Sequence, residues 1–447
     1  AAGADVIVDD VTMFTDPFFQ DGPIGVAISD ATAEGRTYLA AAGNYTRLGV
    51  EGYPSEGAPI SSWATERYRP TACPAVILEA LASTTAPGAT PVTSADCMDF
   101  DPAAGVDPTD TLTFEATPDT ARVTFVMQWA EPVGAAVGSF RFAIVKPDGT
   151  ADVVPASPAG LTSSVGATGV QEGESDFVII RDTSAGPSSQ VTPAVKVLMS
   201  ADPWLQAAEY YTSTGDDTVG PTIAGHAGAP QTVSVAAAPF NDARNLETYS
   251  SGGPTVHYFD YRPDVSPVAT PLATPIVTPK PDITSVDGGF TNFFGQKVGG
   301  ADEVYAFFGT SAAAPAAAAV VALGREHRPQ ATVAEIRTAL GATATSVANP
   351  LPEYFDAENI TGAGLVDAAA FLEALPAPAP APTPTPTPTA APVPSPTPSA
   401  APAADGGKLA ATGASAAGAL GIGSLALLIA GLGAVVVVRR AARASRS

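Results

Sequence analysis

The tract at residues 376–404 constrains the fold of this 447-residue chain most strongly. It consists almost wholly of proline, alanine, threonine and serine, and includes the run APTPTPTPT at 381–389. Such a composition provides no side chains for a hydrophobic core, so the tract is expected to extend as polyproline II. We therefore assign residues 374–408 to a linker and place the folded part of the chain ahead of it.

Two regions on either side of a central segment predict an α/β fold. Residues 1–101 and 209–373 mix apolar strand-like runs with alanine-rich helical runs, a pattern typical of a parallel sheet flanked by helices. The length of the chain is sufficient for two or three domains.

The central segment, residues 102–208, alternates apolar and polar residues with a period of two. Pro147, Asp148 and Gly149 supply a turn between two of its runs. We therefore predict an antiparallel β-sandwich inserted into the α/β domain. The alternating apolar positions are Leu112, Phe114, Ala116, Val123, Phe125, Met127, Trp129, Phe140, Phe142, Ile144, Val195, Val197 and Met199.

The strongest chemical signal is the string FGTSAAAP at residues 308–315, followed by an apolar helical run. Ser311 would stand at the start of that helix, close to free amide groups and the positive end of the helix dipole, where an oxyanion is stabilised. On the simpler interpretation, Gly-Thr-Ser is only an N-capped helix start.

A second signal is YLAAAGN at residues 38–44, an apolar strand that ends in small residues and the amide of Asn44. Taken alone, Gly43 and Asn44 are equally typical of a turn.

Together the two strings resemble motifs of the subtilisin-like (S8) family of serine peptidases. GTSAAAP resembles the nucleophile motif G-T-S-x-A-x-P, and AGN resembles the motif whose Asn donates to the oxyanion. The resemblance implies a subtilisin-like fold with Ser311 as nucleophile and Asn44 in the oxyanion hole. Further matching segments are GADVI at 3–7, KPDI at 280–283 and GAGLVDA at 362–368, whereas Ala316 replaces the His that commonly follows the motif's Pro.

The family's chain order is Asp, His, Asn and then Ser, and the first two residues precede the segment at which this chain begins. No signal peptide precedes the opening run AAGADVIVDD either, so we expect the natural N-terminus to lie upstream and this chain alone to be inactive. The three histidines, His226, His257 and His327, do not stand in the family's H-G-T context. His226 is interpreted as structural.

Asp9 and Asp10 occupy the strand that lines the specificity pocket in the family. They would either favour basic substrate side chains or form a solvated strand end, and we favour the second interpretation.

Cys73 and Cys97 are the only cysteines, and they form either a disulfide or two buried thiols, with the disulfide favoured. Calcium often accompanies the family, so calcium at sites not identified from the sequence is left open, but no run has the oxygen spacing of a calcium loop. No specific metal site and no other cofactor are expected.

The C-terminal region, residues 409–447, predicts an anchor. Leu409, Ala410, Ala411, Thr412 and Gly413 resemble the L-A-x-T-G variant of the L-P-x-T-G signal that sortases cleave between Thr and Gly. An apolar stretch at 414–438, long enough to span a bilayer, and a basic tail follow. The expected alternatives are attachment to a Gram-positive, actinobacterial cell wall after a transient membrane stage, or a plain single-pass membrane protein.

The sequence thus predicts a secreted, surface-displayed serine endopeptidase that acts on polypeptides, with sortase, peptidoglycan and the membrane as further partners. The net charge of −24 repels phosphate backbones, so a nucleic-acid partner is not expected. The alternative is a binding or adhesion module that has kept a peptidase scaffold without activity.

Overall fold

The structure is a computed structural model that describes residues 3–83, 92–103, 105–115, 122–154, 162–184, 186–200, 203–292, 294–298 and 304–376. The expected anchor at 409–447, almost all of the linker and Ala116 lie outside the described residues. Within the described part, none of the helices has both the length and the apolar character needed to cross a bilayer.

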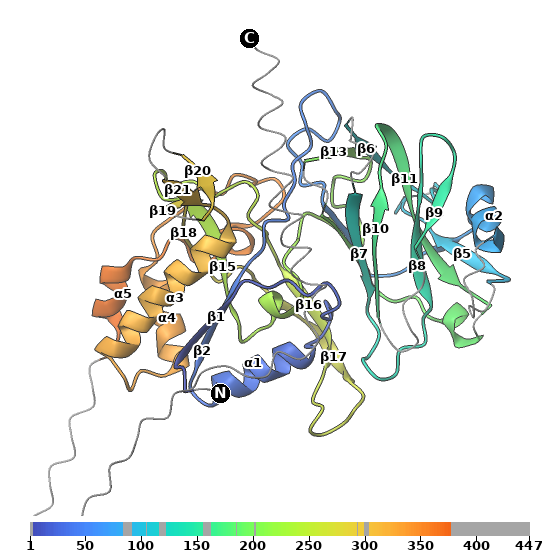
Figure 1. Ribbon diagram of the computed structural model, residues 1–447. Helices are drawn as coiled ribbons and strands as arrows, with labels where there is room; N and C mark the ends of the chain where they lie inside the picture. The colour runs from blue at the N-terminus through green and yellow to red at the C-terminus, as the bar shows by residue number, and fades with distance from the viewer. Residues whose placement is uncertain are drawn as a thin grey trace, which may run out of the picture. The chain divides into compact units, whose positions relative to one another are not determined.

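A four-stranded sheet forms the α/β part and confirms the predicted parallel arrangement (Figure 1). Its strands run in the order β1 (Val6–Asp9), β2 (Thr37–Ala41), β15 (Val233–Pro239) and β18 (Ile283–Asp287), with every neighbouring pair parallel. The helices of this part are α1 (Pro23–Ala33), α3 (Thr310–His327), α4 (Val333–Thr343) and α5 (Ala368–Ala374).

Helix α3 packs across all four strands, because alanines along one of its faces allow a close approach. Ala313, Ala314, Ala317 and Val321 are fully buried against apolar side chains of the sheet. The next helix, α4, begins at a capping box in which the Thr332 hydroxyl accepts from Glu335 N and the Glu335 carboxylate accepts from Thr332 N.

The inserted segment forms two antiparallel sheets. One has the strand order β10 (Ser163–Gly169), β7 (Arg122–Trp129), β12 (Val195–Ser200), β3 (Ser62–Thr65) and β14 (Asp217–Val219). The other runs β13 (Leu205–Ala208), β6 (Asp110–Phe114), β11 (Gly173–Asp182), β5 (Ala95–Met98) and β4 (Pro70–Thr71), with β8 (Phe140–Val145) and β9 (Ala151–Val153) attached through β11.

The expected boundaries at 102 and 208 were too narrow for this sandwich. Strands β3, β4 and β5 precede residue 102, and β14 follows residue 208, yet all four pair with sandwich strands. β3 and β14 pair antiparallel beside β12, so both flanks of the insertion are drawn into its sheets.

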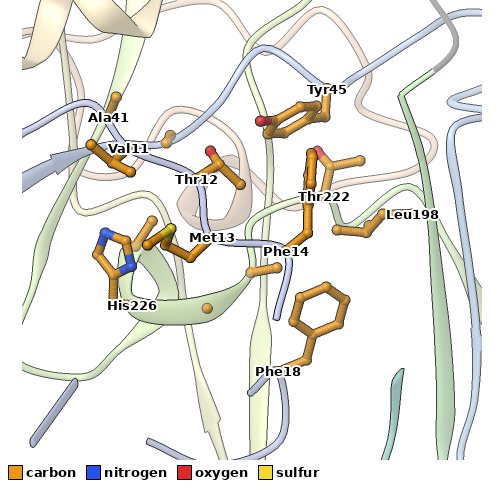
Figure 2. Close-up of a pocket in the computed structure, with 14 residues that line it drawn as sticks. Val11, Thr12, Met13, Phe14, Phe18, Ala41, Tyr45, Leu198, Thr222 and His226 are labelled. Carbon is orange, nitrogen blue, oxygen red and sulfur yellow. The ribbon is translucent and has the colours of Figure 1, made fainter. Parts of the chain in front are cut away.

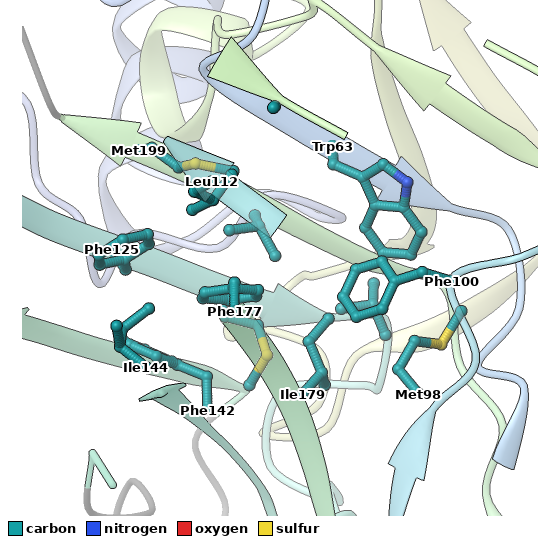
Figure 3. Close-up of a cluster of buried hydrophobic side chains, with 14 of the residues drawn as sticks. Trp63, Met98, Phe100, Leu112, Phe125, Phe142, Ile144, Phe177, Ile179 and Met199 are labelled. Carbon is teal, nitrogen blue, oxygen red and sulfur yellow. The ribbon is translucent and has the colours of Figure 1, made fainter. Parts of the chain in front are cut away.

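The sandwich core is aromatic and matches the predicted alternation. Figure 3 shows Phe125, Phe142 and Phe177 gathered between the sheets, and their ring centroids lie 5.3–5.7 Å apart. The described positions of the alternating set, from Leu112 to Met199, all belong to this buried cluster.

Cys73 and Cys97 form a disulfide that ties the segment before α2 (Ala75–Ser83) to β5.

The remaining elements are short. A ribbon forms from β16 (Thr255–Asp260) and β17 (Thr270–Thr278), and a small sheet from β19 (Gly289–Thr291), β21 (Tyr305–Phe307) and β20 (Gln296–Lys297). Three 3₁₀ turns complete the described elements: η1 (Gly186–Gln190), η2 (Gly225–Gly228) and η3 (Ala357–Asn359).

Gln128 of β7 joins the sandwich to the segment that follows β1. Its Oε1 accepts from Phe18 N at 3.0 Å, and its Nε2 donates to Phe14 O at 3.1 Å and to Asp16 O at 2.9 Å. The side chain is only 1% exposed, so water does not replace these bonds.

Replacing Gln128 by Leu should lower the free energy of unfolding by about 3 kcal/mol, because the substitution leaves buried backbone groups of the segment at 14–18 without partners. Urea unfolding followed by tryptophan fluorescence measures the loss. The exposed Gln231→Leu is the matched control, and equal stabilities of the two variants would contradict the assigned role.

Candidate active site

Ser311 is the second residue of α3, reached through a left-handed glycine. Gly309 has φ of +110°, which a residue with a side chain rarely adopts, and its N–H donates to Asp287 Oδ2 at 2.6 Å. The first amides of a helix have no acceptor within the helix, so the Ser311 N–H is available to a ligand. Pro315 lies inside α3, as the motif predicts.

Asn44 follows β2 and is held against the residue before Ser311. Its Oδ1 accepts from Thr310 N at 2.9 Å and from Thr310 Oγ1 at 3.0 Å, while Gly43 N donates to Thr310 Oγ1 at 3.1 Å. Because a backbone N–H only donates, these bonds fix the amide with Oδ1 toward Thr310. The Asn44 Nδ2 group remains as a donor on an exposed side chain beside the start of α3.

The two carboxylates at the carboxyl end of β1, Asp9 and the following Asp10, differ in their surroundings. Asp10 is exposed and its carboxylate lies beside the Ser311 hydroxyl; partial desolvation raises the pKa of Asp10 above its usual value, and the interaction with Ser311 opposes that rise. Asp9 accepts from the Tyr38 hydroxyl and contacts His226. The interpretation as a solvated strand end is therefore wrong for Asp9, which is partly buried against Tyr38 and His226, whereas Asp10 is exposed to solvent.

His226 lies between two carboxylates. Its Nδ1 is 3.2 Å from Asp16 Oδ2 and its Nε2 is 3.3 Å from Asp9 Oδ1. Burial alone would lower the pKa of His226, but the hydrogen bonds to Asp16 and Asp9 raise it to about 9. The ring is thus protonated at neutral pH and cannot accept a proton from Ser311.

The other two histidines are no better placed. Burial lowers the pKa of His257 to about 4, and its side chain is buried on β16. His327 is the last residue of α3, roughly 24 Å along the helix from Ser311. Neither residue is positioned as a base for Ser311.

Asp16 and Asp287 support the site without having been predicted from the sequence. Asp287 ends β18 and accepts from both Gly309 N and the Tyr249 hydroxyl, and Asp16 accepts from His226 N at 2.7 Å. A carboxylate at the carboxyl end of a parallel strand was the available signal for Asp287. Asp16 lies in an irregular segment and carried no such signal.

Two pockets adjoin these residues. The first, which we call the Leu198 pocket, is shown in Figure 2, where Leu198 and His226 lie on opposite sides. Its lining consists of Val11, Thr12, Met13, Phe14, Phe18, Ala41, Ala42, Tyr45, Leu198, Thr222, Ala224, Gly225, His226 and Ala227. The second, the Arg47 pocket, is lined by Asn44, Tyr45, Thr46, Arg47, Leu48, Met199, Ser200, Thr248 and Tyr249.

The described residues contain no group of three or more His, Cys, Asp or Glu side chains placed to hold a metal ion.

The charge on His226 should make stability depend on pH. A folded-state pKa of about 9, above the ordinary 6.5, means that the ion pairs stabilise fully below pH 6.5 and lose their effect as pH rises through 9. Between pH 6 and pH 9.5, the unfolding free energy of the wild type relative to His226→Gln should fall by about 1 to 2 kcal/mol, allowing for solvent screening.

Titrating groups remote from His226 contribute equally to both proteins, so the difference reports His226 together with its partners Asp9 and Asp16. Urea titrations at the two pH values measure it, with the exposed His327→Gln as control. A difference that does not change with pH would show that His226 is neutral in the folded protein.

Comparisons with known proteins complete the description. Among solved structures, the prenylagaramide maturation protease PagA is similar at 19% identity with a TM-score of 0.22, over 34% of this chain and 45% of that one. A β-glucosidase from Kluyveromyces marxianus, solved with glucose, is similar at 10% identity with a TM-score of 0.18, over 44% of this chain and 25% of that one. The matched regions thus span less than half of either protein, and no curated protein matches the sequence.

The model of the subtilase family, Peptidase S8, matches residues 14–364. This region includes Asn44, Ser311 and the whole inserted sandwich, and it covers well over half of the chain. The protein therefore belongs to the subtilase family of serine peptidases.

Proposed function

We propose that this chain carries the nucleophile and the oxyanion hole of a serine endopeptidase. Ser311 Oγ attacks a peptide carbonyl, the Ser311 N–H and Asn44 Nδ2 bind the resulting oxyanion, and water releases the acyl group from Ser311. The observation that carries the proposal is the pair of bonds from Thr310 to Asn44 Oδ1. They orient the amide donor beside Ser311 before any substrate arrives.

The base that activates Ser311 is, in this proposal, a His oriented by an Asp, both supplied by residues outside these 447. The proposal rests on the positions of the three histidines: His226 is held between two carboxylates, His257 is buried on β16, and His327 ends α3 far from Ser311. It is also supported by the free edge of β1, which pairs only with β2 among the described strands. Val8 on that edge is 39% exposed and Leu323 on α3 is 50% exposed, so a further strand and helix would cover apolar surface.

One observation favours the alternative of a binding or adhesion module. His226 is held between Asp9 and Asp16, and none of the described histidines is placed to take a proton from Ser311. Such a module would need no oriented Asn44 amide, and for that reason we favour the peptidase.

We further propose that the enzyme is displayed on a cell wall. The proposal rests on the order of the Pro-rich linker, the LAATG pentapeptide, the apolar stretch and the terminal arginines. Sortase and peptidoglycan would be partners, the membrane would hold the precursor, and polypeptides near the surface would be substrates.

Ser311→Ala in the complete protein should reduce hydrolysis of an unfolded casein substrate to the background rate. Asn44→Ala should lower kcat about 10²- to 10³-fold with little change in KM, because the lost donor acts on the transition state. Steady-state kinetics measure both effects, and the exposed Asn245→Ala serves as control.

Two results would contradict the proposed catalytic roles. Undiminished hydrolysis by the Ser311→Ala variant would place the nucleophile elsewhere. An active wild type whose kcat is unchanged by Asn44→Ala would remove Asn44 from the oxyanion hole. Complete inactivity of a protein that contains the upstream residues would favour the binding module.

Thr412→Ala should abolish covalent attachment to the wall, because Thr412 would supply the carbonyl that is linked to peptidoglycan. The protein released from cells by a muramidase should fall at least tenfold, with a matching rise in the membrane fraction and medium. Thr385→Ala in the linker is the control. Equal wall fractions for the two variants would rule out sorting at this pentapeptide.

A further inference from the structure

Strand β12 of the inserted sandwich presents its two faces to two different parts of the molecule. Val195, Val197 and Met199 belong to the aromatic sandwich core. The alternate residues, Lys196 and Leu198, are also buried, at 7% and 5% exposure, but they face the α/β part. A strand alternates its side chains between faces, so Ser200 continues the second row.

The contacts of Lys196 and Leu198 place this second row beneath the segment that follows β1. Lys196 Nζ donates to Ile223 O at 3.3 Å and lies 5.9 Å from the centre of the Phe18 ring. Leu198 packs in one cluster with Phe18 and Phe19. β12 is therefore fixed to the α/β part at two successive positions.

Leu198 closes one side of the Leu198 pocket (Figure 2). The other walls begin next to the catalytic groups: Val11 follows Asp10, which bonds to Ser311, and Ala41 and Ala42 directly precede Gly43 and Asn44. Two walls of the pocket are thus continuous in sequence with residues at the proposed nucleophile and oxyanion hole. The inserted sandwich supplies the far side of the pocket.

The same strand reaches the Arg47 pocket. Met199 and Ser200 line it together with Asn44 and Tyr249, and Tyr45 lines both pockets. The consecutive β12 residues 198–200 therefore line the Leu198 pocket and the Arg47 pocket, on either side of Tyr45. If the sandwich were only a spacer between the α/β part and the cell wall, its strand β12 would not be expected to line both pockets.

We propose that the inserted sandwich forms part of the substrate cleft and that Leu198 is a specificity-determining residue. This inference rests on the proposed peptidase function. The side of the Leu198 pocket that Leu198 forms is apolar, with Phe14 and Phe18 as neighbours, while the charge of His226 is balanced by Asp9 and Asp16. The cavity volume of the pocket is only about 20 Å³, so the substrate is a polypeptide that presents a small aliphatic side chain to Leu198.

Peptide binding to the full chain carrying Ser311→Ala tests the inference without turnover. The probes are eight-residue Gly/Ser peptides with one central Ala, Leu or Phe, and NMR titration gives each Kd. Leu198→Ala should shift the Kd ratio of the Leu and Ala peptides about tenfold in favour of Leu, because the pocket deepens. Leu198→Phe should shift preference by a similar factor toward Ala.

Val126→Ala is the matched control, because Val126 pairs with Leu198 and lies in the same cluster but lines neither pocket. Opposite shifts in the two Leu198 variants, absent in the control, would support the inference even if Leu198→Ala lowers stability. Unchanged ratios, equal shifts in the control, or no binding above an all-Gly/Ser peptide would overturn it.

Cleavage-site profiling of the complete protein separates this inference from the proposed function. If the complete protein cleaves no peptide but peptide binding still depends on Leu198, the peptidase function is refuted and the assignment of the sandwich to the cleft is supported. If the complete protein cleaves peptides with a site preference that Leu198 variants do not change, the peptidase function is supported and the role of Leu198 is refuted.

Discussion

The contact between Asn44 and Thr310 is the interaction on which the site depends. It joins the end of β2 to the start of α3, two points 266 residues apart in the sequence. Thr310 gives both a backbone and a side-chain hydrogen bond to the same amide oxygen, and it also accepts from Gly43 N. Two bonds to its oxygen therefore set the direction of the Asn44 amide group, and the third bond holds Thr310 in place. None of them involves a ligand, which is the preorganisation that the proposed oxyanion binding requires.

This contact holds only if the sheet and α3 are positioned independently of it. Alanines on α3 bring the helix close to the strands, and the left-handed Gly309 turns the chain into the helix while donating to Asp287. A Cβ at position 309 would come within 2.9 Å of Asn44 Nδ2, so glycine is required both by its backbone angle and by the proximity of the amide. The motif residues thus serve packing and chemistry together.

Sequence reasoning recovered those features whose cause is local. Alternation of apolar residues reflects the burial of one strand face, so positions from Leu112 to Met199 were identified correctly. The motif strings likewise led to Ser311 and Asn44, which the fold brings to adjacent positions. β3 and β14 were missed as sandwich strands because they are short and are defined by their pairing with β12 and with each other. The engagement of Asp9 was missed for a similar reason, since its partner His226 lies 217 residues away.

The pairing of β3 with β14 also bears on how the chain reaches this fold. β2 and β15 are sheet neighbours, yet about 190 residues separate them, and closing so long a loop is entropically costly. Once β3 and β14 have paired within the sandwich, only about 35 residues of free chain remain to be closed between β2 and β15, a saving of about 1.5 kcal/mol in chain entropy. A sandwich that folds first would thus bring the ends of β2 and β15 close together before they pair. The inserted sandwich would then form first, and the parallel sheet with the site would form after it.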